Sequence, residues 1–258
     1  FNLKGKCNPK SSTGRLDIFC RTILDKSNEY EKIPTKYKGE MFIEITCKSF
    51  NIKFCEGDSL NQMRLTYNKN IYLNDIELKK INKLRKISSS KKEEIFEDGL
   101  KLSVDLSDDK KICAYRSKLN SPLVDFSKNK SHKYYKYWEP IKPINKTLII
   151  KKNNFYILRS KEKICIPPNL AGEMIPYDTG IGDFRVHYAG FFDPGFGYPN
   201  GAYAVLEVKT HEVDFIIEDA QTIARIKYEK LNKFSSVIYG YDINSNYQNQ
   251  KLSLSKHF

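Results

Sequence analysis

A short polar turn, Pro9–Arg15, combines the residue types that bind anions. Ser11 and Ser12 supply hydroxyl donors, and Lys10 and Arg15 supply positive charge on either side of them. Hydroxyls and backbone amides donate hydrogen bonds to phosphate oxygens, and a guanidinium adds a two-pronged fork. The turn therefore predicts a phosphate site, although an ordinary surface turn has the same composition.

Glu207 is a second candidate for chemistry because it stands inside the apolar strand pattern Val205–Val208. Burial raises the pKa of a carboxylate and suits it to accepting a proton during a reaction. An outward-facing glutamate on an alternating strand is the alternative. Glu44, in the similar run Met41–Thr46, is open to the same two interpretations.

The run Tyr188–Gly201 holds five aromatic residues and four glycines in fourteen positions. Glycines allow another group to approach the backbone closely, and aromatic rings stack on other rings. The run is therefore typical of a loop that contacts a nucleobase. A tight hairpin with a packed aromatic cluster would have the same composition.

The overall charge gives weaker information than its size suggests. The 258 residues carry a formal net charge of +13, and 40% of them are hydrophobic, as in a globular protein. The 44 basic residues are 36 lysines and only 8 arginines. Proteins that recognise bases and phosphates favour arginine over lysine, so the composition argues against nucleic acid as a partner.

The sequence also bears on the compartment. No apolar run reaches the roughly 18 residues that span a bilayer, which argues against a membrane partner. The chain begins at Phe1 with neither an initiator methionine nor a signal-peptide pattern, so we expect a processed product or a fragment. The cysteines lack zinc-site spacing and predict buried free thiols in a reducing cytoplasm. They are Cys7, Cys20, Cys47, Cys55, Cys113 and Cys165.

Alternating apolar residues predict mostly short strands, and Leu100–Leu106 is the clearest case. Leu73, Ile76, Lys80 and Leu84 fall instead at helical spacing and predict a helix over 74–86, followed by a polar linker. The further strand candidates are Met41–Ile45, Asn51–Phe54, Leu60–Tyr67, Leu148–Lys152, Phe155–Arg159, Tyr203–Val208, Val213–Ile217 and Thr222–Tyr228.

Two of these regions repeat each other at a fixed offset. Glu44 and Glu207 are 163 residues apart, and the strands around them match at the same offset, Leu60 falling on Ile223. The match predicts two tandem copies of one all-β unit. We place them at residues 1–87 and 88–258, the first copy being shortened at its N-terminal end.

Three segments together resemble the dCTP deaminase family, in its tandem, pseudo-dimeric form. They are Ile166–Asp178, the Ala-Gly-Phe-Phe-Asp-Pro-Gly-Phe-Gly run ending at Gly197, and Ala204–Val208. The turn Lys10–Arg15 is similar to the family's Arg-Ser-Ser-x-x-Arg turn, with lysine in place of the first arginine. The tail Tyr239–Gln250 resembles the closing arm of the family, so the resemblance covers nearly the whole chain.

The resemblance implies a fold and a reaction. The fold is the distorted jelly roll of the dUTPase-like superfamily. The reaction removes the 4-amino group of dCTP to give dUTP and ammonia, for dUTP and dTTP biosynthesis. Family members use no zinc, and magnesium reaches the site on the substrate's triphosphate. By the family's pattern Glu207 is the general base, because without a metal to acidify water a carboxylate must take the proton.

The resemblance also implies nucleotide-binding residues and divides them between the copies. The first copy keeps the phosphate turn, whereas its counterpart 177–182 in the second copy has no cation. We therefore expect one composite site, with Glu44 either structural or vestigial. The implied binding residues are Lys10, Ser11, Ser12, Arg15, Asp193, Gly195, Phe196, Tyr239, Tyr247 and Gln250.

A few residues depart from the family pattern or stay open. Asn246 stands where the family's arm carries a lysine, which removes one cation. Gln62 matches a common family glutamine, and Arg225 is its counterpart in the second copy. Arg225 either reaches phosphate or is solvated, and His187 either contacts the base region or belongs to the core.

Two other functions compete with dCTP deamination. The first is a dUTP diphosphatase, or a bifunctional deaminase and diphosphatase, although a glycine-free tail at 252–258 argues against the diphosphatase motif. The second is a catalytically silent jelly-roll protein that binds nucleic acid or a regulator. By resemblance, we also expect dTTP as an effector and self-association into a trimer-like oligomer in the cytoplasm.

Overall fold

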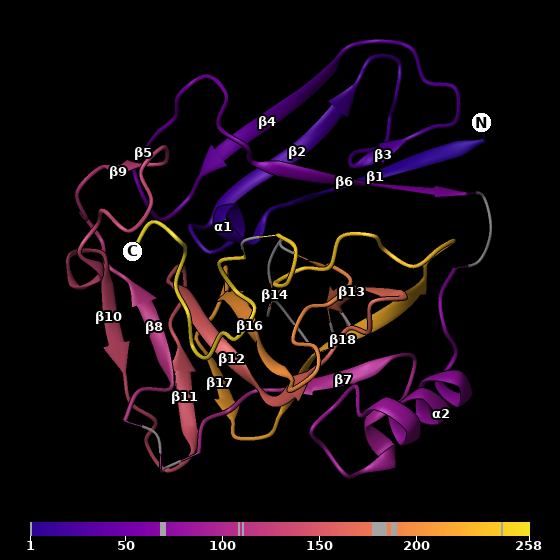
Figure 1. The fold of residues 1–258 in the computed structure, drawn as a ribbon. Coiled ribbons are helices and arrows are strands. Elements are labelled where there is room, and N and C mark those ends of the chain that lie inside the picture. Colours follow the sequence, from indigo (N-terminus) through magenta and orange to yellow (C-terminus); the bar gives the residue numbers. More distant parts are fainter. Residues whose placement is uncertain are drawn as a thin grey trace.

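The computed structural model describes residues 2–67, 71–107, 109, 111–176, 185–186, 190–243 and 245–258. Strands dominate these residues (Figure 1), which confirms the all-β prediction. The first copy contains β1 (Leu3–Pro9), α1 (Ser11–Gly14), β2 (Ile18–Leu24), β3 (Lys32–Ile33), β4 (Met41–Cys47), β5 (Ile52–Lys53) and β6 (Asn61–Tyr67).

Helix α2 (Asp75–Arg85) leads into the second copy. The second copy contains β7 (Leu100–Ser103), β8 (Ala114–Ser117), β9 (Val124–Asp125), β10 (Trp138–Ile141), β11 (Thr147–Ile150), β12 (Phe155–Ile164), β13 (Leu170–Pro176), β14 (Arg185–Val186), β15 (Phe191–Phe192), β16 (Ala202–Lys209), β17 (Phe215–Glu218) and β18 (Thr222–Lys230). Short 3-10 turns lie at Glu93–Ile95 and Tyr134–Lys136.

The strand pairing repeats in the two copies, as the sequence offset predicted. In the first copy β1 pairs with β3 and β6, and β2 pairs with β4. In the second copy β13 pairs with β15 and β18, and β14 pairs with β16. The register agrees as well. Gly5 lies opposite Leu65, and Gly172, 167 residues beyond Gly5, lies opposite Tyr228, 163 residues beyond Leu65.

The second copy has strands that the described part of the first copy lacks. β18 pairs also with β7, whereas among the described residues its counterpart β6 has no strand on that edge. β16 pairs also with β12, whereas its counterpart β4 has no described strand on that edge. Apolar positions buried in the second copy are therefore open in the first. Ile43 is 44% exposed, whereas its counterpart Leu206 is 0% exposed. We call this surface the open face, and its residues are Met41, Ile43, Ile45, Met63 and Leu65.

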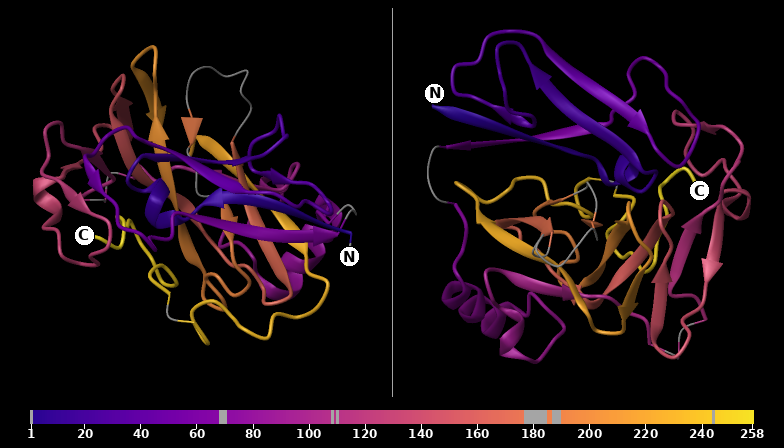
Figure 2. Two further views of the ribbon diagram at one scale, coloured as in Figure 1. Left: turned by 90° about the horizontal axis from the view of Figure 1, so that it is seen from above. Right: turned by 180° about the vertical axis from the view of Figure 1, so that it is seen from behind.

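The two copies share a hydrophobic cluster, which fixes their relative position. Leu16 and Ile18 of the first copy pack in it with Trp138 and Phe155 of the second. Phe258 packs against the same cluster, with its ring centroid 6.0 Å from that of Trp138. The C-terminal segment thus lies between the copies (Figure 2) and is anchored to both. A site built from both copies therefore has a defined geometry.

Helix α2 forms where its spacing predicted it, but with a different buried side. The Asn74 side chain caps its first turn by accepting a hydrogen bond from a backbone amide. Leu78 is fully buried and Ile81 packs beside it, whereas Ile76 and Leu84 are 69% and 83% exposed. Contacts with the second copy, rather than the local spacing, decide which side is buried. The linker that follows lies along β12, where the amide of Ser89 donates to Lys163.

Two expectations about the surface can now be compared with the structure. All six cysteines are free thiols. The prediction that all are buried is wrong for Cys47, at the end of the largely exposed strand β4, and for Cys55, in an exposed turn after β5 where its amide donates to Asp58. Among the described residues, no helix has both the length and the apolar character needed to cross a membrane.

Candidate active site

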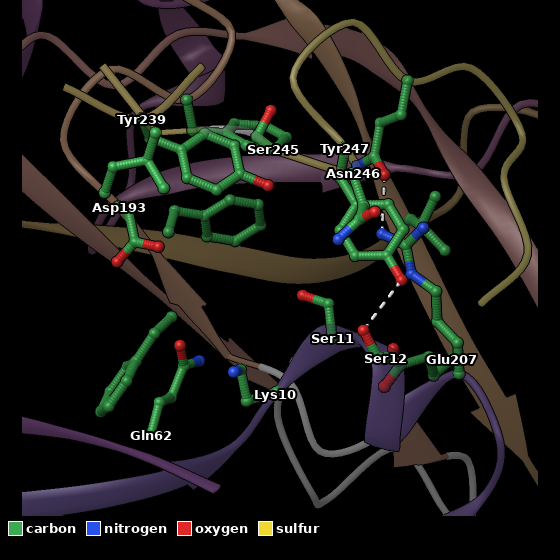
Figure 3. Close-up of a pocket in the computed structure, with 17 residues that line it drawn as sticks. Lys10, Ser11, Ser12, Gln62, Asp193, Glu207, Tyr239, Ser245, Asn246 and Tyr247 are labelled. Atoms are coloured by element: carbon green, nitrogen blue, oxygen red, sulfur yellow. Dashed lines mark hydrogen bonds between the residues drawn. The ribbon is translucent and has the colours of Figure 1, made fainter. Parts of the chain in front are cut away.

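A cavity of about 260 Å³ lies between the two copies and the C-terminal segment (Figure 3). The structure brings together around it every predicted site residue except Gly195. These lining residues are Lys10, Ser11, Ser12, Arg15, Asp193, Phe196, Glu207, Tyr239, Tyr247 and Gln250. Residues far apart in the sequence therefore converge on one hollow, and both copies contribute to it.

The phosphate turn is a single helical turn, α1, that follows β1 directly. Pro9 ends the strand, and Lys10 has an extended backbone that starts the turn. The amide of Lys10 and the hydroxyl of Thr13 both donate to the carbonyl of Leu60, at 2.9 and 2.8 Å. These bonds tie the turn to the start of β6. The turn therefore presents Ser11 and Lys10 to the cavity from a fixed backbone (Figure 3).

Glu207 lies on β16 and is only 3% exposed. Its carboxylate lies against the backbone of Gly14, since a Cβ on residue 14 would be 2.9 Å from Glu207 Cδ. Two residues further along the same face of β16, Lys209 Nζ pairs with Asp17 Oδ2 at 2.6 Å in a buried ion pair. This face of β16 is thus held against the phosphate turn of the first copy.

Asp193 lies across the cavity from Glu207 (Figure 3). Burial raises the pKa of Asp193, while the charges of Arg64 and Lys10 act in the opposite direction. Gly195 follows it with a φ of +97°, and a Cβ there would be 3.0 Å from the carbonyl oxygen of Tyr239. Gly195 thus does not line the cavity. It allows the loop and the C-terminal segment to pack closely.

The C-terminal arm, Tyr239–Phe258, is folded against the cavity. The Tyr247 hydroxyl is 3.1 Å from Ser12 Oγ, and its ring lies under the Arg15 guanidinium at 3.9 Å. Arg15 donates from Nη2 to Gln250 Oε1 at 2.7 Å and from Nη1 to the carbonyl of Ser253 at 3.1 Å. In this arrangement the arginine fork, expected to bind phosphate, binds the arm.

The electrostatic environment at the arm has two further consequences. Burial lowers the pKa of Arg15, while Tyr247 and then Glu207 act in the opposite direction by favouring its charge. Burial also raises the pKa of Tyr239 to about 12, so its phenol stays protonated near neutral pH. Tyr239 can therefore donate a hydrogen bond into the cavity.

Other residues in or behind the cavity wall were not assigned a role from the sequence. Gln62, which matched a family glutamine, does line the cavity. Gln248 lies behind the wall and ties the arm to the glycine loop, donating to the Gly195 carbonyl at 2.8 Å. The sequence signal that could have identified Gln248 is its position between Tyr247 and Gln250, which both match the family's arm. The other unassigned lining residues are Phe191, Phe192, Val205, Ile243, Ser245 and Asn246.

Several candidate residues lie elsewhere. Glu44, on β4, does not line the cavity. It pairs at the surface with Arg21 on the neighbouring strand β2, at a distance of 2.9 Å. Arg225 also does not line it. His187 and the counterpart turn 177–182 lie outside the described residues. Of the two repeated glutamates, only the one in the second copy faces the composite cavity.

Comparison with known proteins identifies the family. Residues 1–69 match the model of the N-terminal domain of 2′-deoxycytidine 5′-triphosphate deaminase (DCD), and residues 74–258 match the model of its C-terminal domain. A crystal structure of 2′-deoxycytidine 5′-triphosphate deaminase from Agrobacterium tumefaciens is similar, with 39% sequence identity and a TM-score of 0.83. The similarity covers 90% of this chain and 70% of that one. No curated protein sequence matched the chain.

The structural similarity confirms the predicted dUTPase-like jelly roll. The two family models together cover both copies, α2 and the arm. The division at residues 1–87 and 88–258 stays a prediction. With the cavity, the repeated strand pairing and these matches in agreement, the chain belongs to the 2′-deoxycytidine 5′-triphosphate deaminase family.

Proposed function

We propose that this chain deaminates dCTP to dUTP and ammonia, with Glu207 as the general base. One observation carries the proposal: a buried glutamate of one copy and the hydroxyl-rich turn of the other line the same cavity. A triphosphate and a reacting base need such a combination, with cations and donors at one end and a shielded carboxylate at the reacting atom.

In this mechanism water adds to C4 of the cytosine ring. Glu207 takes one proton from the water as its oxygen bonds to C4, and the C4–N3 double bond shifts its electron pair to N3. Glu207 passes this proton to N3, then takes the remaining proton from the hydroxyl group now on C4 and passes it to the 4-amino group. The C4–N bond to that group breaks, ammonia leaves, and the oxygen forms the C4 carbonyl of dUTP. Of the two water protons, one ends on N3 and the other leaves with ammonia, so the reaction balances without a redox partner.

The charge near Glu207 supports this role. Arg15 and Glu207 attract each other through their opposite charges, and Gln250 of the arm fixes the Arg15 guanidinium. Gly14 leaves room for the carboxylate because it has no side chain. A base held in one position lowers the cost of orienting it in the transition state.

The two ends of the nucleotide have different partners in this proposal. Lys10, Ser11 and Ser12 bind the triphosphate, and magnesium enters as part of the Mg–dCTP substrate. Among the residues that the structure describes, the carboxylates that line the cavity are Asp193 and Glu207, on its opposite walls. In this proposal phosphate oxygens and water therefore carry the ion rather than a protein cage. Asp193, Phe196 and Tyr239 contact the sugar and base.

We further propose one active site for each pair of copies, with dTTP as an effector and a trimer-like assembly in the cytoplasm. Glu44 has no catalytic part in it. Nucleotide titration and the mass in solution test the stoichiometry and the assembly. Displacement of dCTP by dTTP tests the effector.

The function itself is tested by incubating the protein with magnesium and either dCTP or dUTP, and by assaying ammonia and pyrophosphate. Ammonia from dCTP without pyrophosphate is the expected result. Ammonia together with pyrophosphate would make the enzyme bifunctional. Pyrophosphate from dUTP without ammonia from dCTP would overturn the proposal in favour of a diphosphatase. Neither product, with salt-dependent DNA binding, would make the protein a silent binder.

A further inference from the structure

Arg64 lies on β6 in the first copy, yet its guanidinium binds three strands of the second. Nη1 donates to the carbonyl of Gly172 on β13 at 2.9 Å, and Nη2 donates to the carbonyl of Phe192 on β15 at 2.7 Å. Nη1 also lies 3.3 Å from Glu229 Oε2 on β18. The Arg64 side chain is only 16% exposed. One partly buried fork thus joins both copies and fixes two backbone carbonyls.

The segment that Arg64 binds forms a wall of the cavity. Phe191, Phe192 and Asp193 all line the cavity, and Arg64 stacks on the ring of Phe191 at 4.0 Å. Arg64 Nη2 is 4.0 Å from Asp193 Oδ1. Gln62, two residues earlier on the same side of β6, lines the cavity directly. Arg64 is therefore behind the wall, in contact with the loop that carries Asp193 and not with the hollow itself.

The repeat provides an internal comparison for this side chain. At the offset of 163 residues, the counterpart of Arg64 is Lys227 on β18. Lys227 pairs with Asp98 at 3.0 Å, and its ammonium lies over the ring of Tyr72. Neither Asp98 nor Tyr72 lines the cavity. An ammonium also lacks the rigid planar fork that binds two carbonyls at once. The arginine is thus found at the position that contacts the cavity loop, and lysine stands at the counterpart position.

The charge of Arg64 has a second effect on the same loop. Burial raises the pKa of Asp193, and Arg64 is first among the charges that lower it, followed by Lys10. An ionised Asp193 only accepts hydrogen bonds, whereas a protonated one also donates. Arg64 therefore influences both where Asp193 lies and which groups it can bind.

We propose that Arg64 is a positioning residue that fixes the Phe192–Asp193 loop and thereby sets the affinity of the cavity for the nucleotide. The proposal rests on the proposed function, since it assigns Asp193 to nucleotide binding. Glu207, which transfers the proton in the proposed mechanism, lies on the opposite wall of the cavity (Figure 3), away from the loop that Arg64 contacts. Loss of Arg64 changes substrate binding more than the chemical step.

The test compares R64M and R64K with K227M, the matched change at the counterpart position. For R64M we expect the KM for Mg–dCTP to rise about tenfold or more, with kcat within about threefold of wild type. R64K keeps the charge but loses the fork, and we expect a smaller rise. K227M should leave KM unchanged. The KM of R64M should also rise more steeply than that of wild type as the pH is lowered, because Asp193 protonates more readily without Arg64.

Some outcomes would overturn the proposal. An unchanged KM in R64M would do so, and so would a fall in kcat at constant KM, which indicates a merely structural residue. If R64M fails to fold, R64K is the test: a raised KM supports the proposal, and an unchanged KM overturns it. If wild type releases no ammonia from dCTP, the proposed function has failed. The ratio of dCTP dissociation constants between wild type and R64K, from calorimetry, then still tests Arg64.

Discussion

The carboxylate of Glu207 rests on the backbone of Gly14, so closely that residue 14 has no room for a Cβ. The two residues belong to different copies of the repeat and are 193 positions apart in the sequence. The contact places the proposed base against the turn proposed to bind phosphate. The position of the proposed general base thus depends on a glycine that does not itself line the cavity.

Substituting Gly14 with alanine should therefore reduce catalysis. The new methyl group displaces the Glu207 carboxylate, and a displacement of about 1 Å costs about 100-fold in rate. We expect kcat to fall by that order, with a smaller effect on KM, in a steady-state ammonia assay. Gly57→Ala is the control. A Cβ at residue 57 meets nothing within 4 Å, although its φ of +88° strains an alanine. It should lower stability and leave kcat unchanged. A G14A enzyme with wild-type kcat would contradict the packing argument.

The two repeated glutamates give a matched pair of variants. Glu207→Gln should lower kcat by at least about 100-fold, because an amide cannot accept the proton that general-base catalysis moves. Glu44→Gln should retain activity, since Glu44 is at the surface in an ion pair with Arg21. Single-turnover rates of dUTP formation measure both. Loss of deamination in E44Q with activity kept in E207Q would reverse the assignment.

His257 predicts a pH dependence of stability. It has no exposed surface, and its Nε2 is 2.9 Å from the carbonyl of Phe126. Burial lowers its pKa to about 4, whereas the unfolded chain binds the proton near pH 6.5. Its contribution is therefore complete above pH 6.5 and is lost as the pH falls toward about 4. The slope is below about 1.4 kcal/mol per pH unit.

Urea unfolding at pH 7.5, 6 and 5 measures this loss. His257→Asn should be less stable than wild type at pH 7.5 and should lose less stability on acidification. Equal acid dependence in the two proteins would show that other groups cause it. The arm closes the cavity, so the variant should also raise the KM for dCTP.

The open face gives a second matched pair. Leu206→Ala should lower the free energy of unfolding by about 2–5 kcal/mol, because Leu206 is in the core of the second copy. Ile43→Ala, at the counterpart position, should cost less than about 1 kcal/mol, because Ile43 is 44% exposed. Chemical denaturation with both variants checks this. Equal losses would mean that the open face is covered in solution.

Much of the fold could be predicted because its signals are local. Strand alternation and the capped helix near Asn74 can be read within short windows, and the offset of 163 residues comes from comparing two such windows. The structure contains each of these features. The exposure of Cys47 could not be read in this way. It lies on β4, and whether a β4 residue is buried depends on a neighbouring strand that the local pattern does not describe.

The site was predicted less completely, for a related reason. The phosphate turn, the glycine loop and the arm each have a recognisable composition, and they do meet at one cavity. Arg64 has no such signature, since a single arginine in a strand is usually solvated. Its partners, the carbonyls of Gly172 and Phe192, follow from how the two copies pack. The engagement of Arg15 by Gln250 has the same origin.

The arm affects the order in which the molecule can be assembled. Ser12 contacts Tyr247 and Ser255, which follow it by 235 and 243 residues. A ribosome has therefore synthesised the strands of both copies, from β1 to β18, before the chain reaches the residues that close the cavity. Contacts of such long sequence separation form slowly, because loop-closure entropy must be overcome before they add stability. We therefore expect the candidate active site to be among the last parts of the molecule to form during folding, because Ser12 and Arg15 lack their partners until the arm docks.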